Sequence, residues 1–276
     1  MNLKNKVAVI TGAGGVLCSA FAENLASLGC SVALLDINEE AVKEVAEKIK
    51  KQGGVAEFYS CSVLDKEQVE KVHKSILNTL GRCDILINGA GGNNPRCTTA
   101  HEYYEAGDEE RNDIKTFFNL DKEGFDFVFS LNLMGTLIPT QVFSVDMLNR
   151  DGCIINISSM NAFTPLTKIP AYSSAKAAVS NFTQWLSVHF AKAGIRVNAI
   201  APGFFVTKQN KDLLFNADGT PTQRTNKILN ATPMGRFGKP EELFGALNFL
   251  CDKSASGFVT GVVIPVDGGF SAYSGV

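Results

Sequence analysis

Short runs of apolar, often β-branched residues alternate along the chain with longer segments in which apolar side chains recur every three or four positions. The short runs predict buried strands at Val7–Ile10, Ser31–Leu35, Val55–Tyr59, Asp84–Ile87, Cys153–Ile157, Arg196–Ile200 and Val262–Val266. The longer segments predict helices at Leu17–Leu28, Glu39–Lys51, Lys66–Leu80, Gly124–Leu148, Ala171–Lys192 and Pro240–Leu250. This alternation predicts an α/β fold, in which a parallel sheet of seven strands is covered by helices on both faces.

Two segments interrupt the alternation, residues 91–119 and residues 204–232. Each directly follows a predicted strand, and in an open parallel sheet ligands bind outside the carboxyl ends of the strands. Compact domains rarely carry loops of this length without a use for them. We therefore expect the two segments to form the walls and lid of a ligand cleft within a single domain spanning residues 1–276. The alternative is that they are unconstrained surface insertions.

Composition narrows the class of protein. Of the 276 residues, 45% are hydrophobic and 20% are charged, and the formal net charge is −2 without a basic block, so a nucleic-acid partner is not expected. No apolar run approaches the roughly 20 residues of a membrane span, and the first residues lack the apolar core of a signal peptide. These features predict a cytoplasmic protein without a membrane partner. The seven cysteines form no Cys-x-x-Cys pair, which favours reduced, buried thiols over a metal site or disulfides.

The turn after the first predicted strand has the composition of a phosphate-binding loop. Thr11-Gly12-Ala13-Gly14-Gly15-Val16-Leu17-Cys18 opens directly into a helix, whose N–H groups and positive end favour a pyrophosphate. Asp36 ends the second strand, where a carboxylate accepts hydrogen bonds from both adenosine ribose hydroxyls and repels a 2′-phosphate. The pattern therefore predicts NAD as cofactor, with NADH preferred over NADPH. The alternatives are that the glycines only form a tight turn and that Asp36 caps a helix.

A second group of polar residues suggests proton transfer. Tyr172 and Lys176 are four residues apart on one face of a predicted helix, and an adjacent ammonium is expected to lower the pKa of a phenol toward neutrality. Ser159, at the end of the fifth strand, can hold a substrate carbonyl against Tyr172. Asn132, in the helix beginning near Gly124, can hold a water that links Lys176 to solvent. Each of these patterns also occurs by chance in ordinary helices and turns.

Taken together, these residues resemble the short-chain dehydrogenase/reductase family over nearly the whole sequence, from about Leu3 to Phe270. The resemblance implies a single Rossmann-type domain, usually a homotetramer, that moves hydride and a proton between NAD(P) and a carbonyl or alcohol. It implies that Asn132, Ser159, Tyr172 and Lys176 are the catalytic residues. The cofactor contacts that it implies, together with those expected above, are Gly12, Gly14, Gly15, Val16, Leu17, Asp36, Ser62, Val63, Asn88, Ala90, Gly91, Tyr172, Lys176, Pro202, Gly203, Phe205 and Thr207.

The sequence departs from the family pattern at three positions. Val16 and Cys18 replace the second and third glycines of the usual turn, so we expect a slightly shifted turn and a bulkier helix–strand contact. Ser62 stands where the family commonly has an aspartate that binds the adenine amino group.

The long segments suggest a short, polar and acidic substrate. Amides and cations suited to hydroxyls and a carboxylate occur at Asn93, Asn94, Arg96, Asn161, Lys208, Gln209 and Asn210, with Arg224 further along. The Gly91–Pro95 opening and Phe204-Phe205 resemble the D-mannonate oxidoreductases of this family, which interconvert D-fructuronate and D-mannonate. Each of these residues can equally be a turn former or a solvated charge. The alternatives left open are a gluconate or polyol 5-dehydrogenase, a 3-oxoacyl carrier-protein reductase and a non-catalytic NAD-binding sensor.

Overall fold

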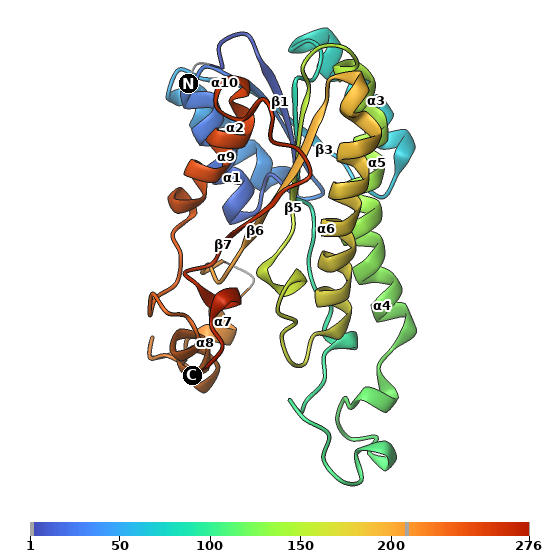
Figure 1. Ribbon diagram of the computed structural model, residues 1–276, viewed down its shortest axis with the longest axis vertical. Coiled ribbons are helices and arrows are strands. Elements are labelled where there is room, and N and C mark those ends of the chain that lie inside the picture. The colour runs from blue at the N-terminus through green and yellow to red at the C-terminus, as the bar shows by residue number, and fades with distance from the viewer. Residues whose placement is uncertain (1–2, 208–209, 276) are drawn as a thin grey trace.

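The computed structural model describes residues 3–207 and 210–275. Its centre is a parallel sheet of seven strands in the order β3-β2-β1-β4-β5-β6-β7. The strands are β1 Val7–Thr11, β2 Ser31–Asp36, β3 Val55–Ser60, β4 Ile85–Asn88, β5 Cys153–Ile157, β6 Arg196–Pro202 and β7 Val263–Val266. The order reverses between β1 and β4, where the chain crosses from one half of the sheet to the other (Figure 1). The predicted single-domain α/β fold is confirmed.

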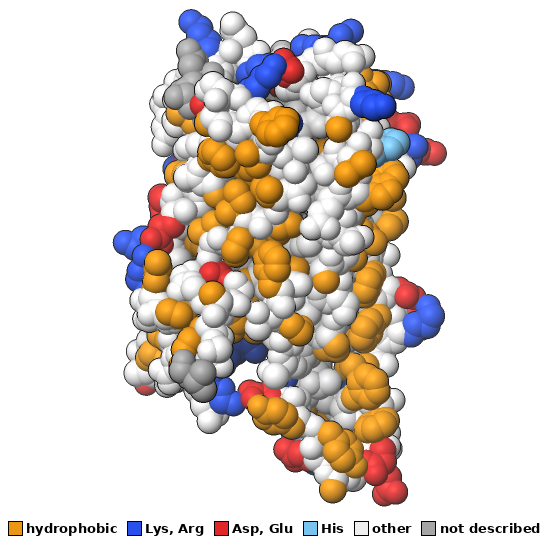
Figure 2. Space-filling view, in the orientation of Figure 1, with side chains coloured by type: hydrophobic (Ala, Val, Ile, Leu, Met, Phe, Trp, Pro, Cys, Tyr) orange, Lys and Arg blue, Asp and Glu red, His pale blue; other side chains and the backbone are white. Residues whose placement is uncertain are grey.

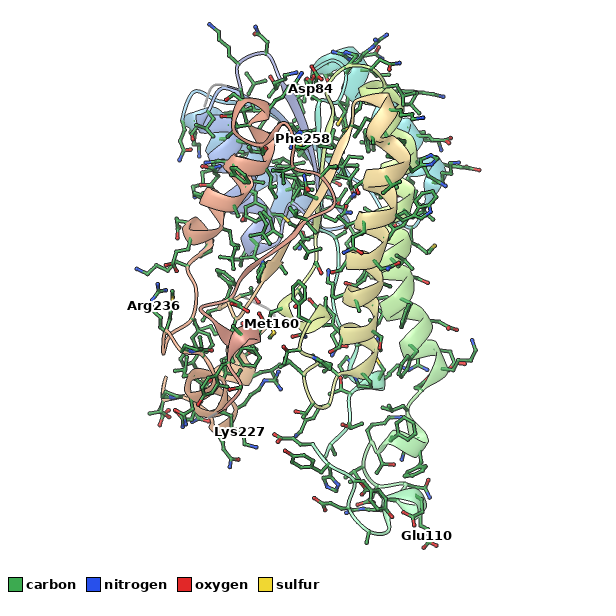
Figure 3. All side chains as sticks on the ribbon, viewed as in Figure 1. Asp84, Glu110, Met160, Lys227, Arg236 and Phe258 are labelled. Carbon is green, nitrogen blue, oxygen red and sulfur yellow. The ribbon has the colours of Figure 1, made fainter. Side chains whose placement is uncertain are left out.

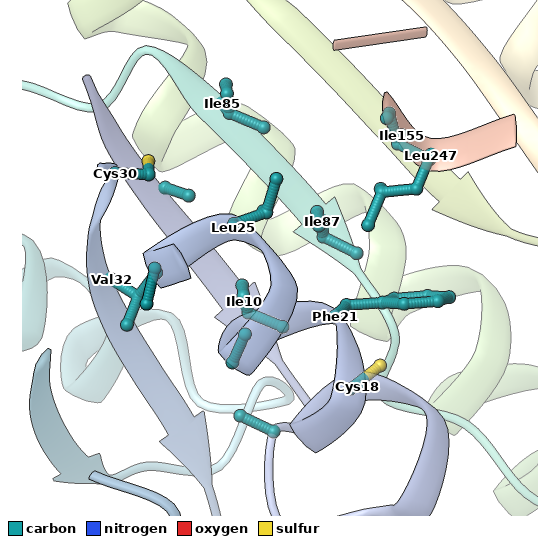
Figure 4. Close-up of a cluster of buried hydrophobic side chains, with 14 of the residues drawn as sticks. Ile10, Cys18, Phe21, Leu25, Cys30, Val32, Ile85, Ile87, Ile155 and Leu247 are labelled. Carbon is teal, nitrogen blue, oxygen red and sulfur yellow. The ribbon is translucent and has the colours of Figure 1, made fainter. Parts of the chain in front are cut away.

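Helices cover both faces of the sheet. On one face lie α1 Val16–Ser27, α2 Glu39–Lys51 and α9 Phe244–Cys251, and on the other lie α3 Lys66–Thr79, α5 Gly135–Met147 and α6 Pro170–Phe190. Phe21 and Leu25 of α1 pack with Ile10 and Leu247 in the hydrophobic core on the face covered by α1, α2 and α9, which Figure 4 shows in close-up. Because every central strand is buried on both faces, its sequence is a continuous apolar run rather than an alternating one.

Local chemistry sets the ends of the helices. Asn38 caps α2 by accepting a hydrogen bond from the backbone N–H of Ala41, and Asp65 caps α3 in the same way from Gln68. Acidic side chains in the first turn of α2 and lysines in its last turn complement the helix dipole. These capping residues explain why the predicted and observed limits of the two helices agree within one residue.

The predicted helix Gly124–Leu148 is longer and less regular than its sequence pattern suggests. It begins at Lys122 as α4 Lys122–Phe129, passes through a π-helical turn at Ser130–Met134 and continues as α5. By length and composition alone the stretch Lys122–Met147 could cross a membrane. Half of its most apolar window is buried within the protein, and core helices meet the same criterion, so this finding carries little weight.

The two interrupting segments contain more structure than expected. Residues 204–232 include the short helices α7 Lys211–Leu214 and α8 Gln223–Ala231. Only Thr225 and Ile228 of α8 are buried, so its apolar stripe is too sparse to stand out in the sequence. Residues 91–119 project from the lower end of the molecule in Figure 1 and hold three single-turn 3₁₀ helices, Pro95–Cys97, Asp108–Glu110 and Phe117–Asn119.

Cys18 makes the bulkier contact that its place in the glycine-rich turn predicts. A Cβ atom on Gly89 would lie 2.1 Å from the Cys18 sulfur and 2.8 Å from the Thr11 carbonyl oxygen. All seven cysteines are buried with free thiols, and burial raises the pKa of the Cys18 thiol to about 12. Cys18 is therefore a packing residue, fitted to the glycine opposite it.

We predict that Gly89→Ala destabilises the protein by about 2–3 kcal/mol, because the new methyl group overlaps the Cys18 sulfur. In a Cys18→Ala background the same substitution should cost less but not become neutral, since the Thr11 oxygen stays close. Urea unfolding of the four proteins in this double-mutant cycle measures the coupling. Gly245→Ala is the control, because a Cβ there meets nothing within 4 Å; an equal cost of Gly89→Ala in both backgrounds would contradict the prediction.

Candidate functional site

The predicted site residues gather at one edge of the sheet. The parallel register places the carboxyl ends of β1, β4, β5 and β6 side by side. Gly12, Gly91, Ser159 and Gly203 follow these four strands. Figure 3 shows Met160, the neighbour of Ser159, far from Asp84, which precedes β4 at the opposite edge. A parallel sheet therefore collects short polar segments from distant parts of the sequence at this edge.

In the turn after β1, two glycines allow neighbouring atoms to lie very close to the backbone. Gly12 has a φ of +65°, and a Cβ there would lie 2.8 Å from the backbone nitrogen of Ala90. A Cβ on Gly14 would lie 2.8 Å from the Cβ of Ala41 and 3.2 Å from a carboxylate oxygen of Asp36. Only glycine fits at either position without displacing a neighbour. The resulting cradle ends at Gly15, the residue from which α1 starts with Val16 and Leu17.

Asp36 is held in place by two backbone N–H groups. One carboxylate oxygen accepts from Gly14 at 3.0 Å and the other accepts from Asn38 at 3.0 Å. The cap of α2 is Asn38, so Asp36 is not the helix-capping residue of the alternative hypothesis. Each carboxylate oxygen keeps a further lone pair for a hydroxyl donor. Nearby, Ser62 accepts a hydrogen bond from the Leu64 N–H at 3.3 Å.

Lys176, Tyr172 and Ser159 come together between β5 and α6. The Lys176 ammonium is buried, donates to the carbonyl oxygen of Ile157 at 2.8 Å, and lies 5.7 Å from the centre of the Tyr172 ring. Ser159 lies two residues beyond the end of β5, rather than in the strand, and accepts from the backbone N–H of Asn161 at 3.2 Å. These contacts fix the serine, the phenol and the ammonium within one small volume.

The pKa values of this group differ in part from expectation. Burial lowers the pKa of Lys176 from 10.5 to about 8. Burial also raises the pKa of Tyr172 above its usual value, although a hydrogen bond with Ser159 lowers it in part. The expectation that Lys176 lowers the pKa of the Tyr172 phenol toward neutrality was wrong, because burial of the phenol outweighs the interactions that lower its pKa.

Asn132 lies in the π-helical turn and is buried, as Lys176 is. Its amide donates to the carbonyl oxygens of Gly92 and Val128, both at 2.8 Å, and its side-chain oxygen accepts from the Gly92 N–H at 3.3 Å. A Cβ on Gly91 would lie 2.7 Å from that side-chain oxygen and 3.1 Å from the Lys176 nitrogen. Asn132 thus fixes the Gly91–Gly92 turn against the ammonium.

Asn88, expected beside the adenosine ribose, is held by hydrogen bonds within the protein. Its amide is buried and donates to the Thr140 hydroxyl at 2.9 Å and to the Asn156 side-chain oxygen at 2.8 Å. Asn156 in turn donates to Thr183 of α6 at 2.9 Å. This side chain therefore joins β4 and β5 to the helices behind them, while its buried side-chain oxygen has no hydrogen-bond partner within the described residues. The backbone of Ala90 and Gly91 remains partly exposed at the site.

The segment after β6 forms a second wall of the site. The Phe205 ring is buried against Gly238, whose Cβ would lie 2.5 Å from it, so this side chain belongs to the core. Asn210, predicted to contact substrate, instead bridges the backbone, donating to the Phe205 carbonyl and accepting from the Thr207 N–H, both at 2.8 Å. Pro202 and Gly203 close the end of β6 against Asp267. Lys208 and Gln209 lie outside the described residues.

The residues of the first long segment are largely engaged with one another. Asn93 donates to the Thr98 hydroxyl at 3.1 Å, and Asn94 caps the first 3₁₀ turn. The Arg96 guanidinium, predicted to take a substrate carboxylate, forms a 2.7 Å ion pair with Asp121. These interactions fit the alternative that the sequence left open, in which such residues form turns or lie at the surface as charged groups.

Asn161 differs from the other predicted substrate residues. It is buried beside Ser159, and its side-chain oxygen has no hydrogen-bond partner within the described residues. A buried acceptor without a donor is costly unless a ligand or water satisfies it.

Sequence reasoning missed most of the pocket that the two long segments form. A pocket of about 320 Å³ lies between them, lined by Glu102, Leu166, Thr167, Lys168, Phe204, Gln223, Arg224, Lys227, Ile228, Ala231 and Phe270. Of its charged residues only Arg224 was a candidate. Sequence patterns do not indicate the others, because α8, the loop before α6 and Glu102 meet around the pocket only in the folded protein.

Comparison with known proteins places this architecture among oxidoreductases. Residues 12–271 match the enoyl-(acyl carrier protein) reductase family. An uncharacterized oxidoreductase of Haemophilus influenzae is 61% identical over 276 residues, which cover the whole chain and 96% of that protein. The oxidoreductase UxuB of Bacillus subtilis, also uncharacterized, is 53% identical over the whole chain and 98% of its own length.

A solved structure agrees closely with the present one. The crystal structure of a provisionally named D-mannonate oxidoreductase, also from Haemophilus, has NAD bound and is 60% identical. It matches the whole chain and 98% of its own with a TM-score of 0.95.

We predict that Lys176→Met makes the protein more stable at pH 7, by about 2 kcal/mol. A fall in the lysine pKa from 10.5 to about 8 on folding corresponds to roughly 3 kcal/mol, from which the lost Ile157 hydrogen bond removes about 1 kcal/mol. Between pH 8 and 10.5 the unfolded wild type binds more protons than the folded one, so its stability rises with pH and the difference shrinks.

Urea unfolding at pH 7, 9 and 10.5 tests this. Lys74→Met on the exposed side of α3 controls for loss of a lysine without burial. A Lys176→Met variant that is less stable than wild type at pH 7, or a difference independent of pH, would contradict the assigned desolvation.

Proposed function

Because this chain belongs to the short-chain dehydrogenase/reductase family of oxidoreductases, we propose that it uses NAD to interconvert a keto-sugar acid and its hydroxy acid, D-fructuronate and D-mannonate. The observation that carries this proposal is the cluster of Ser159, Tyr172 and Lys176 beside the glycine cradle, at the sheet edge where this fold binds ligands. The NAD-bound D-mannonate oxidoreductase structure, similar over its full length, supports the choice of substrate.

The residues present fit a nicotinamide dinucleotide. The glycines at positions 12 and 14 leave room that a Cβ would fill, and the start of α1 offers N–H groups to a pyrophosphate. Asp36 keeps lone pairs for ribose hydroxyls and would repel a 2′-phosphate, which favours NADH over NADPH. When bound, the nicotinamide supplies or accepts the hydride.

The protein's own residues handle the proton and the carbonyl. Ser159 donates a hydrogen bond to the substrate carbonyl and orients it toward Tyr172. The Tyr172 phenol gives its proton to the carbonyl oxygen in reduction and takes it back from the hydroxyl in oxidation. Lys176, fixed by Ile157, places a positive charge beside the phenolate that remains after reduction. Asn132 holds the turn that closes over this ammonium.

Asn161 suits a polyhydroxylated substrate. Its buried side-chain oxygen, without a partner in the described residues, can accept from a substrate hydroxyl next to the reacting carbon. An apolar steroid or fatty-acyl group would leave this acceptor unsatisfied. The amide therefore favours a sugar-derived substrate over a fatty-acyl one.

We also propose a cytoplasmic homotetramer. Val145 of α5 and Trp185 and Val188 of α6 expose most of their side chains to solvent. Figure 2 shows hydrophobic side chains along the side of the molecule that α4, α5 and α6 form. A contiguous apolar face of this kind favours association between copies.

The direct test follows NADH by its absorbance at 340 nm, with purified protein and D-fructuronate, D-tagaturonate, 5-keto-D-gluconate, fructose or an acetoacetyl thioester. We expect NADH to be oxidised with D-fructuronate and NADPH to be oxidised more slowly. Turnover confined to 5-keto-D-gluconate or to the thioester would replace the proposed substrate with one of the alternatives. Absence of turnover despite NADH binding would favour a sensor.

We predict that Tyr172→Phe lowers kcat by about 10²–10⁴-fold, because the proton donor is removed while the ring stays in place. NADH affinity, measured by the fluorescence of the bound nucleotide, should change less than threefold. Tyr59→Phe is the matched control, since its hydroxyl contacts Thr79 on an exposed surface. A Tyr172→Phe variant that keeps wild-type kcat, or that loses NADH binding, would refute the assigned role.

A further inference from the structure

The pocket between the two long segments differs in charge from the rest of the molecule. Lys168, Arg224 and Lys227 face a single carboxylate, Glu102, so the lining carries two positive charges in excess. The protein as a whole has a net charge of −2, which makes this local excess distinctive. In Figure 2 basic side chains lie in the notch between the two lower projections, and Figure 3 labels Lys227 there.

One of the three cations is already paired. The Lys227 ammonium lies 2.8 Å from a Glu102 carboxylate oxygen, joining α8 to the first long segment. The pKa of Glu102 is lowered chiefly by the hydrogen bond and the charge of Lys227, and further by the charges of Lys168 and Arg224, which line the same pocket. Within the described residues, the structure gives neither Lys168 nor Arg224 a side-chain hydrogen bond or an ion pair. Two cations therefore remain for an anion.

Lys168 is held at the entrance to the catalytic helix. Its φ is +72°, a conformation that residues other than glycine rarely adopt. Its carbonyl oxygen accepts from the Thr99 N–H at 2.8 Å, which ties this loop to the first long segment. Tyr172 follows four residues later in the first turn of α6. The half-buried Lys168 side chain is thus placed by a constrained backbone just before the helix that carries Tyr172.

The remaining walls suit a small organic anion. Leu166, Phe204, Ile228 and Phe270 supply apolar surface, and the Phe204 and Phe270 rings meet edge to face at 5.2 Å. Thr167 and Gln223 add hydroxyl and amide groups. A pocket with apolar walls and a few convergent polar groups is typical of small-molecule sites.

We propose that Lys168 and Arg224 bind the carboxylate of the substrate and so select an acidic keto sugar over a neutral one. This inference rests on the proposed function and names the residues that set its specificity. It moves acid recognition away from Arg96, whose guanidinium is paired with Asp121 at 2.7 Å and lies 3.6 Å from Glu123. Lys227 is paired with Glu102 in the pocket lining and is not assigned a contact with the substrate.

The test compares Lys168→Gln, Arg224→Gln and Arg96→Gln by steady-state kinetics with D-fructuronate and with fructose. We expect Lys168→Gln and Arg224→Gln each to raise KM for the acid about tenfold, as expected for loss of one charge-assisted contact, with kcat changed less than threefold. KM for the neutral sugar should not change. Arg224→Lys, which keeps the charge, should restore most of the affinity. A KM for the acid that rises only in Arg96→Gln, or equally for both sugars, would overturn the proposal.

A second measurement separates this inference from the reaction itself. D-mannonate should raise the Tm of the NADH-bound wild type, and the rise should be lost in Lys168→Gln and Arg224→Gln but kept in Arg96→Gln. If no keto acid is turned over yet this pattern is seen, the proposed reaction fails and the anion pocket stands. If D-mannonate raises the Tm of wild type, Lys168→Gln and Arg224→Gln equally, or raises none of them, the pocket assignment is overturned.

Discussion

The hydrogen bond from the Lys176 ammonium to the carbonyl oxygen of Ile157 is the contact on which the site depends. It joins α6 to the end of β5 and holds a charged group in a buried position, where its pKa falls to about 8. Burying an ammonium destabilises the fold, so the charge is kept at the expense of stability. Such a conflict is typical of functional positions, because a catalytic charge is most effective where water is excluded.

Close approach of backbone to side chain makes this arrangement possible. Gly91 brings its backbone against the side chains of Asn132 and Lys176, while Gly12 lies close to the backbone of Ala90. Behind them, the buried hydrogen bonds among Asn88, Asn156 and Thr183 fix the strands to the helices. The site therefore rests on a rigid polar framework, and its selectivity can reside in the segments that project beyond the sheet.

The charged residues of the projecting segments and of the loop before α6 fall into two groups, those with an ion-pair partner and those without one in the described residues. Arg96 and Lys227 are paired with carboxylates, whereas no such pair engages Lys168 or Arg224 within the described part of the molecule. Charged residues of the same type thus play different roles according to the partner that the fold brings to them. Sequence alone cannot distinguish them, because ion pairs form between residues far apart along the backbone.

The sequence by itself determined the fold class and most strand and helix limits, and it predicted that Tyr172 and Lys176 lie together, because hydrophobic periodicity and the Tyr172–Lys176 spacing are local properties. It also led to the expectation that Cys18 packs against a neighbouring strand. Only the tertiary structure decided that Asn88 is a framework residue, that Asn210 caps its own segment, and that α8 forms. These outcomes depend on contacts between distant segments. The cationic pocket also depends on such contacts, since α8 and the loop before α6 both line it.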